Sequence, residues 1–105
     1  MSESLFFEYL YYLETIKCLS TNTVSAYCAD LTNYFNYLTS KSTLTQLTNA
    51  TEDTILAYIA SIKNSYSATS VRRHIVSIKI FYQYLVDRRI VNTNPAIALD
   101  PIKAE

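Results

Sequence analysis

The chain has 105 residues, 50% hydrophobic and 17% charged, and its formal net charge at pH 7 is zero. This balance favours one globular domain over a disordered chain, and no apolar run approaches a membrane span of about 20 residues. Glycine is absent and only two prolines occur, which argues against strand hairpins and predicts an all-α fold.

The first predicted helix covers about residues 3–18. Apolar side chains recur there at helical spacing, and they are Leu5, Phe6, Tyr9, Leu10, Leu13 and Ile16. The segment holds more aromatic rings than one face buries, so we expect some of them to contact another surface.

The second predicted helix begins with Ser20 or Thr21 as N-cap and ends at about Ser40. Its apolar stripe consists of Val24, Tyr27, Cys28, Leu31, Tyr34, Phe35 and Leu38, with Asn22, Ser25, Ala29, Asn33 and Asn36 opposite. Residues 41–50 are rich in Ser, Thr and Asn, and we expect a packed connection anchored by Leu44 and Leu47.

Two further helices complete the predicted fold. Asn49 or Thr51 caps the third, whose core face is Ile55, Leu56, Ile59 and Ile62 and which ends at residues 63–65. Ser67 caps the fourth, which runs to about Arg89 or Ile90 with Val71, Ile75, Ile78, Tyr82 and Leu85 as its buried stripe. Asn94-Pro95 stops helical structure, so we predict a compact bundle of four main helices around one core.

The residues predict no catalytic group, metal site or cofactor. The ten tyrosines fall on helices, many of them on apolar stripes, where packing is their ordinary role. His74 has no second ligand at metal-binding spacing and is expected to be a partly buried helix residue. Without glycine, a phosphate-cradling loop of the P-loop or dinucleotide type is excluded.

The start of the fourth helix carries the most suggestive polar groups. Its apolar stripe places Arg73 roughly opposite the core and Arg72 about a quarter-turn away. Thr69, Ser70, Ser77 and Lys79 are predicted on or beside this outer side. Arginine forks onto phosphates or guanine edges, and helix starts with small hydroxyls donate to phosphates, so the pattern fits DNA as well as an ordinary solvated face.

Three blocks of sequence also resemble a known family. Residues 19–27 (LSTNTVSAY), followed by Asp30-Leu31 and Tyr37-Leu38, resemble the opening motif of the N-terminal, SAM-like core-binding domain of tyrosine recombinases. This family includes phage integrases and Xer recombinases. Residues 68–75 (ATSVRRHI), with 77–79 and 81–85 after them, are similar to that domain's last helix, and Asn94-Pro95 with residues 101–103 resemble its exit toward the catalytic domain.

The resemblance implies a non-catalytic domain over residues 1–100, with 101–105 starting a linker to a catalytic domain that would hold the arginines, histidine and nucleophilic tyrosine. Its second and fourth helices would clamp double-stranded DNA at a recombination half-site, and its first helix would touch neighbouring recombinase protomers. The implied DNA-facing residues are Ser20, Asn22, Thr23, Ser25, Thr69, Ser70, Arg72, Arg73 and Lys79. Cys28 and Ala29 stand where many relatives are basic, so we expect weak binding by an isolated, monomeric domain.

An alternative from a different class is a helical protein-interaction module that uses the exposed aromatics of the first helix. The acidic N-terminus does not read as a secretory leader, and Cys18 and Cys28 do not form a disulfide framework. Both features predict a cytoplasmic protein with no membrane partner.

Overall fold

The structure, a computed structural model, describes residues 3–40 and 47–100. This part of the chain contains four α-helices and no strand: α1 (Glu3–Tyr11), α2 (Thr21–Ser40), α3 (Glu52–Ile62) and α4 (Ala68–Asp87). A π-helical turn, η1 (Tyr12–Ile16), continues α1, and a 3-10 turn, η2 (Leu47–Asn49), precedes α3. The all-α prediction is confirmed. The predicted anchor Leu44 and the predicted linker at 101–105 lie outside the described residues.

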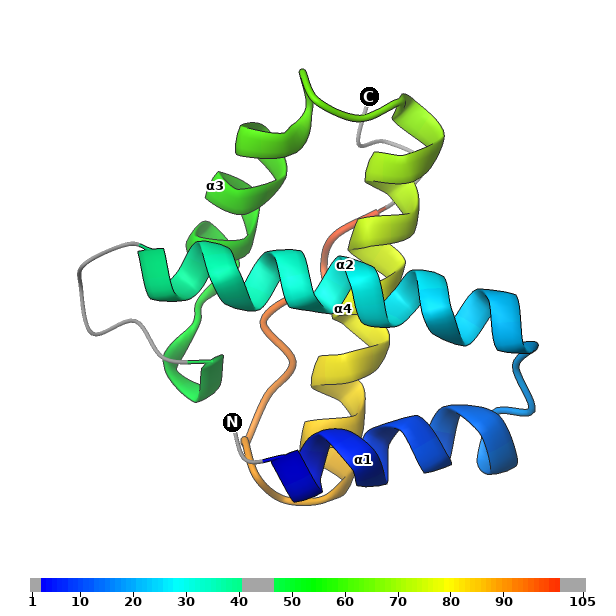
Figure 1. The fold of residues 1–105 in the computed structure, drawn as a ribbon. Coiled ribbons are helices and arrows are strands. Elements are labelled where there is room, and N and C mark those ends of the chain that lie inside the picture. The colour runs from blue at the N-terminus through cyan, green and yellow to red at the C-terminus, as the bar shows by residue number, and fades with distance from the viewer. Residues whose placement is uncertain (1–2, 41–46, 101–105) are drawn as a thin grey trace.

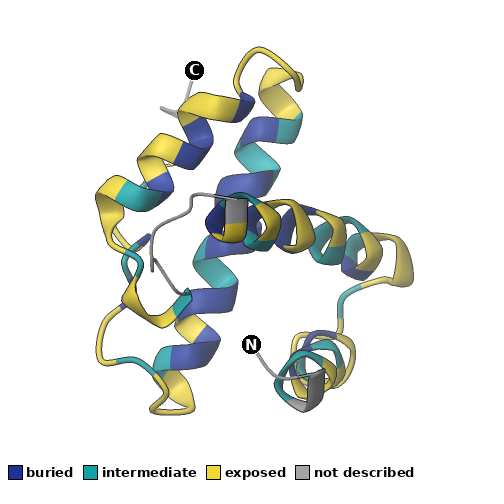
Figure 2. Ribbon diagram, turned by 60° about the vertical axis from the view of Figure 1, so that its left-hand side comes forward, coloured by how far each residue is buried: buried dark blue, intermediate teal, exposed yellow. Residues whose placement is uncertain are grey.

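Helix α4 is the element around which the others pack. Figure 1 shows α2 lying across the middle of α4, with α1 near one end of α4 and α3 near the other. The ring of Tyr9 in α1 meets Phe81 and Tyr84 in the C-terminal half of α4, at centroid distances of 5.0 and 5.1 Å. Tyr58 in α3 lies beside His74 in the N-terminal half. Buried residues consequently recur along most of α4, and Figure 2 shows this distribution.

The core is unusually rich in tyrosine. Four tyrosines are at most 2% exposed, and they are Tyr9, Tyr34, Tyr58 and Tyr82. The hydroxyl oxygens of Tyr34 and Tyr82 lie 2.8 Å apart, and the Tyr82 hydroxyl donates to the carbonyl of Leu47 at 2.8 Å. Because Tyr82 gives its proton to Leu47, the Tyr34 hydroxyl is the donor to Tyr82. These bonds tie η2 to α2 and α4.

The predicted helix starts at Ser20, Thr51 and Ser67 are confirmed by their capping bonds. The Ser20 hydroxyl accepts from the Thr23 amide at 3.2 Å, and the Ser67 hydroxyl accepts from the Ser70 amide at 3.2 Å. Thr51 accepts from the Thr54 amide at 3.3 Å, and its own amide donates to the Thr54 hydroxyl. Each cap satisfies one of the amides that a helix start leaves without an intrahelical partner.

Two helix ends use left-handed backbone without glycine. Cys18 has φ 54° after η1, and Arg89 has φ 60° after α4. At the second end, the Arg89 amide donates to the Val86 carbonyl and the Ile90 amide to the Leu85 carbonyl, both at 2.9 Å. This closing pattern normally recruits glycine. Helix α4 therefore ends at Asp87, slightly before the predicted end at Arg89 or Ile90.

The first helix differs from its prediction in its last turn. The Lys17 amide donates to the Tyr12 carbonyl at 3.0 Å, which widens the turn beyond α-helical spacing. Ile16, which was predicted to continue the apolar spacing of this helix, lies in the widened turn and is 69% exposed. Leu56, predicted on the core face of α3, is 43% exposed.

The segment after α4 folds back onto the bundle through a buried asparagine. The Asn94 amide nitrogen donates to the Lys79 carbonyl at 3.0 Å, and its oxygen accepts from the Ala96 amide at 2.9 Å. The Lys79 ammonium in turn donates to the Leu99 carbonyl at 2.6 Å.

In the described ranges, no helix is both long and apolar enough to cross a bilayer.

Candidate nucleic-acid interface

The start of α2 presents short polar side chains around its cap. The Ser20 hydroxyl donates to the Thr23 hydroxyl at 2.9 Å, so these two side chains hold each other. Asn22 and Ser25 are exposed, and Thr23 is half-buried. Val24 is buried beside them and fixes this turn to the core. The four predicted residues of α2 therefore lie together on the surface of its first turn and a half.

The start of α4 has a similar arrangement with arginine added. Thr69 is exposed and its hydroxyl accepts from Nη2 of Arg72 at 3.4 Å. The half-buried Ser70 hydroxyl accepts from the capping hydroxyl of Ser67 at 3.2 Å. The positive end of the helix dipole and the Arg72 guanidinium thus act at the same turn, an arrangement that suits an anion.

The crossing of α2 and α4 is held by a charged pair. Asp30 of α2 is 1% exposed, and Arg73 of α4 donates to both of its oxygens, from Nε at 2.9 Å and from Nη2 at 2.8 Å. The Ser77 hydroxyl donates to the same carboxylate at 2.8 Å. Hydrogen bonding to Asp30 raises the pKa of the Arg73 guanidinium, whose side chain is 40% exposed.

His74 completes this crossing as a neutral group. Its Nε2 lies 3.1 Å from an Asp30 oxygen without the alignment of a hydrogen bond, and its Nδ1 lies 3.1 Å from the Tyr58 hydroxyl. Burial lowers the pKa of His74, an effect that Asp30 opposes and Arg73 reinforces. His74 is fully buried, whereas the sequence predicted a partly buried residue.

The sequence predicted that the polar residues of α4 share one outer face. The structure does not place them on one face. The side of α4 predicted to face outward at Arg73 and Ser77 is the side that α2 crosses, so Ser77 is fully buried. Lys79 lies about 120° around α4 from Arg73 and binds the Leu99 carbonyl instead. The starts of α2 and α4 extend from the crossing toward separate corners of the molecule (Figure 1).

The charge distribution around these two starts favours a negatively charged ligand. Asp30 is the only acidic residue of α2, and it is buried against Arg73. No acidic residue occurs between Asp53 and Asp87, a stretch that includes nearly all of α4. Negative charge gathers instead on the first helix, at the start of α3 and at the C-terminal ends of α4 and the chain. The zero net charge is therefore an average over the whole chain, and it does not describe these two helix starts, where no acidic residue occurs within residues 20–25 or 67–73.

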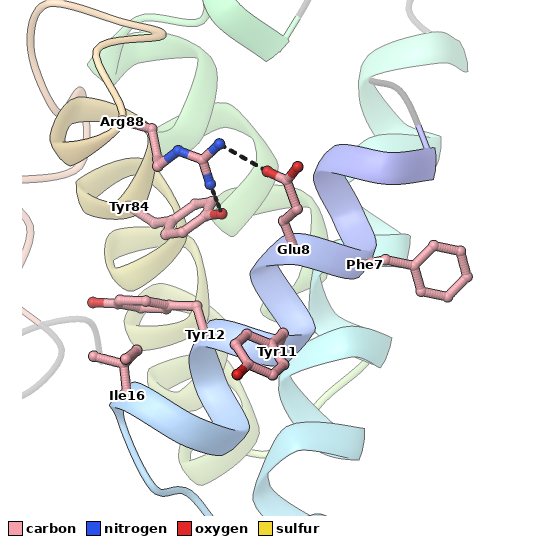
Figure 3. A pocket seen from close by; sticks show the side chains of 7 residues that line it. All are labelled: Phe7, Glu8, Tyr11, Tyr12, Ile16, Tyr84 and Arg88. Atoms are coloured by element: carbon pink, nitrogen blue, oxygen red, sulfur yellow. Dashed lines mark hydrogen bonds and ion pairs between the residues drawn. The ribbon is translucent and has the colours of Figure 1, made fainter.

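A second surface feature is an apolar groove beside α1. An open apolar groove of about 480 Å³ runs between α1, η1 and the end of α4, lined by Phe7, Glu8, Tyr11, Tyr12, Ile16, Tyr84 and Arg88 (Figure 3). Arg88 binds Glu8 at 2.8 Å and donates to the Tyr84 hydroxyl at 2.6 Å, which joins α1 to α4. Phe7 and Tyr11 are each 67% exposed.

The tyrosine hydroxyls of the core are poorly suited to ionisation. Burial raises the pKa of Tyr34 to about 12 and raises the pKa values of Tyr9, Tyr58 and Tyr82 as well. Cys18 and Cys28 are free thiols. Within residues 3–40 and 47–100, no cluster of three or more His, Cys, Asp or Glu side chains has a geometry that would hold a metal ion.

Comparison with known proteins matches residues 6–89 to the family model described as "Phage integrase, N-terminal SAM-like domain". The chain is 30% identical over 99 residues to tyrosine recombinase XerC of Herpetosiphon aurantiacus, covering 93% of this chain and 32% of the relative. It is 34% identical over 94 residues to tyrosine recombinase XerD of Rickettsia bellii, covering 89% and 30%. The chain thus spans about a third of the length of these relatives. No solved structure gives a significant match.

Proposed function

Because the chain belongs to the phage integrase N-terminal SAM-like domain family, we propose that it binds duplex DNA at a recombination half-site through α2 and α4. The observation that carries this proposal is the family match over residues 6–89, which spans both helices. The contact set begins with the exposed or half-buried polar groups of the two starts: Ser20, Asn22, Thr23, Ser25, Thr69, Ser70 and Arg72. Phosphate contacts from these groups would position the domain on the duplex.

The polarity of the two starts supports this proposal. Both begin with capped amides, and the only carboxylate of α2 is neutralised by Arg73. A phosphate backbone approaching these turns therefore meets hydroxyls, amides and the Arg72 guanidinium without an exposed acid on either helix start. Few cations are available, so the affinity of this domain alone should be low and its salt dependence shallow.

The whole protein that contains this chain would be a tyrosine recombinase that breaks and rejoins DNA. The relatives' names support that activity, and the chain corresponds to about a third of their length. The chemistry would belong to the remaining two thirds. The present chain would bind the half-site, and its covalent linkage to the rest of the protein would raise the effective affinity of both parts for DNA.

The DNA-binding proposal is tested by anisotropy titration of a labelled mixed-sequence duplex at low salt. We expect Arg72→Gln to weaken binding and to reduce the slope of log K against log salt by about 0.9, the loss of one phosphate contact. Arg89→Asn is the matched control because it removes the same charge at the opposite end of α4 and retains a residue that tolerates left-handed backbone. Equal effects of the two variants, or no binding by the unaltered domain, would contradict the proposal.

A second candidate function concerns the apolar groove of α1. Phe7 and Tyr11 expose large rings beside the Glu8–Arg88 pair, which is a composition typical of protein interfaces. We propose that this face contacts a neighbouring recombinase protomer when copies assemble on DNA, while the isolated domain stays monomeric. A general protein-interaction module is the alternative use of the same rings.

This contact is tested by the cooperativity of binding to a duplex long enough for two copies. Phe7→Ser with Tyr11→Ser should abolish cooperativity and leave the affinity for a short duplex unchanged. Ile97→Ser removes an apolar side chain of similar exposure outside the groove and serves as the control. A binding curve that stays cooperative in the double variant would exclude this role of the groove.

A further inference from the structure

Asp30 is the only buried carboxylate in the described part of the chain. It receives two hydrogen bonds from Arg73 and one from Ser77, at 2.8–2.9 Å, and Nε2 of His74 lies 3.1 Å away. These three partners belong to two successive turns of α4, whereas Asp30 belongs to α2. Two turns of α4 therefore contact one side chain of α2 at the point where the helices cross.

The hydrogen bonds of Asp30 fix the direction of α2 relative to α4 as well as the distance between the two helices. A bidentate pair between arginine and carboxylate is planar, and the Ser77 hydroxyl adds a third bond from a second point along α4. Hydrophobic contacts at a helix crossing tolerate rotation more readily because they are not directional. The polar contacts of Asp30 consequently constrain the orientation of α2 on α4, together with the bond between the Tyr34 and Tyr82 hydroxyls.

The same geometry limits what Arg73 does elsewhere. Its Nε and Nη2 both point at Asp30, and diverting them to a phosphate would leave the buried carboxylate without its charged partner. Breaking a buried pair in this way is strongly unfavourable. Arg72, one residue earlier, lies at the helix start, where its Nη2 donates to the Thr69 hydroxyl at 3.4 Å.

We propose that Asp30 and Arg73 form a positioning pair, and that Arg73 acts on DNA affinity by fixing how α2 crosses α4 without itself contacting DNA. The proposal rests on the proposed DNA-binding function. Residues 20–25 precede Asp30 by five to ten positions, which places them about 7–15 Å along the helix from the crossing. Rotation at Asp30 would therefore displace the polar start of α2 relative to the start of α4.

The test uses Arg73→Lys, Arg73→Gln, Asp30→Asn and the double variant Asp30→Asn/Arg73→Gln. Lysine keeps the charge of Arg73 and loses the planar fork, so Arg73→Lys separates charge from geometry. The first measurement is the orientation of α2 relative to α4 in the free domain, from residual dipolar couplings. The second is the affinity for the mixed-sequence duplex and its salt slope, at a temperature where each variant is folded.

We expect every substitution to change the orientation of α2 and to weaken DNA binding by about 2- to 30-fold, the range for residues that act through others. The salt slope should stay that of the unaltered domain, because no phosphate contact is lost. The double variant should be no weaker than either single variant. If Asp30→Asn or Arg73→Gln does not fold, Arg73→Lys and the double variant still decide, because neither leaves a buried charge without a partner.

Opposite results would overturn the proposal. A phosphate-binding Arg73 requires Arg73→Lys to retain affinity, Arg73→Gln to lower the slope by about 0.9, and Asp30→Asn to strengthen binding by releasing the arginine. A purely stabilising pair requires unchanged helix orientation and affinity with a lower free energy of unfolding. Loss of the DNA-binding function itself is recognised separately, because the unaltered domain then fails to bind while the helix orientation remains measurable.

Discussion

At the scale of single residues, the buried tyrosines differ in whether their hydroxyls have partners. The Tyr82 hydroxyl bonds both Tyr34 and the Leu47 carbonyl, whereas the Tyr9 hydroxyl has no hydrogen-bond partner among the described residues. Tyr82→Phe should lower the free energy of unfolding by about 1–3 kcal/mol, because it leaves two buried polar groups unsatisfied. Denaturant unfolding measures this loss.

Tyr9→Phe is the matched comparison because it removes the same atom from an equally buried ring. It should leave stability unchanged or raise it by about 1 kcal/mol, since burying a hydroxyl without a partner is unfavourable. Equal losses in the two variants would show that the partners of Tyr82 contribute nothing to stability.

Arg89 offers a second prediction at this scale. A residue with a Cβ loses about 1–2 kcal/mol of stability in the left-handed backbone conformation that Arg89 adopts. Glycine avoids this loss, but its greater freedom in the unfolded chain offsets part of the gain. Arg89→Gly should therefore raise the free energy of unfolding by about 0.5–1 kcal/mol. Arg89→Ala keeps the Cβ and should give no gain, so similar midpoints for the glycine and alanine variants would refute this explanation.

Sequence reasoning placed residues well where local chemistry decides. The caps at Ser20, Thr51 and Ser67 follow from side chains that bond their own helix start, and all three were predicted. The partner of Arg73 was missed because Asp30 lies 43 positions away in the chain. A single acid at the edge of the apolar stripe of α2 was the available signal, because such a carboxylate needs a cation when it is buried.

At the scale of elements, the α2–α4 crossing should respond to pH through His74. Its neighbours are Asp30 and Arg73, together with Tyr58 and Tyr66, and burial holds its folded pKa below the ordinary value of about 6.5. The unfolded chain therefore takes up a proton first as pH falls. Stability is fully present above about pH 6.5 and is lost below it, by up to about 1.4 kcal/mol per pH unit.

Urea unfolding at pH values from about 7.5 to about 5.5 measures this loss, because the interval brackets the ordinary histidine pKa of about 6.5. His74→Gln has no group that titrates there, so its stability should change less over the same interval. A free energy of unfolding that rises as the solution is acidified, or an identical pH dependence in the variant, would contradict a neutral, buried His74.

The elements themselves were predicted more reliably than their faces. The period of apolar residues gave α2, α3 and α4 close to their observed bounds. The same period assumes a regular helix, so the π-turn at η1 displaced Ile16 from its expected position. It also assumes one buried stripe, whereas α4 is covered on several sides because α1, α2 and α3 all pack against it.

At the scale of the whole molecule, the placement of the acidic residues links the fold to its proposed role. Residues 20–25 and 67–73 include no acidic residue, whereas Glu52 and Asp53 lie in the first turn of α3. Composition alone gave a net charge of zero, because it averages over the whole chain. The DNA-facing residues were inferred from the family resemblance, and their role stays a prediction.

The most direct test of the DNA-binding role is an NMR titration of the isotope-labelled domain with a mixed-sequence duplex at low salt. Amide shifts should gather at residues 20–25 of α2 and 69–72 of α4, and they should disappear as salt is added because phosphate contacts are screened. Shifts centred on residues 5–12, or no shifts at all, would contradict the account and favour α1 as the functional surface.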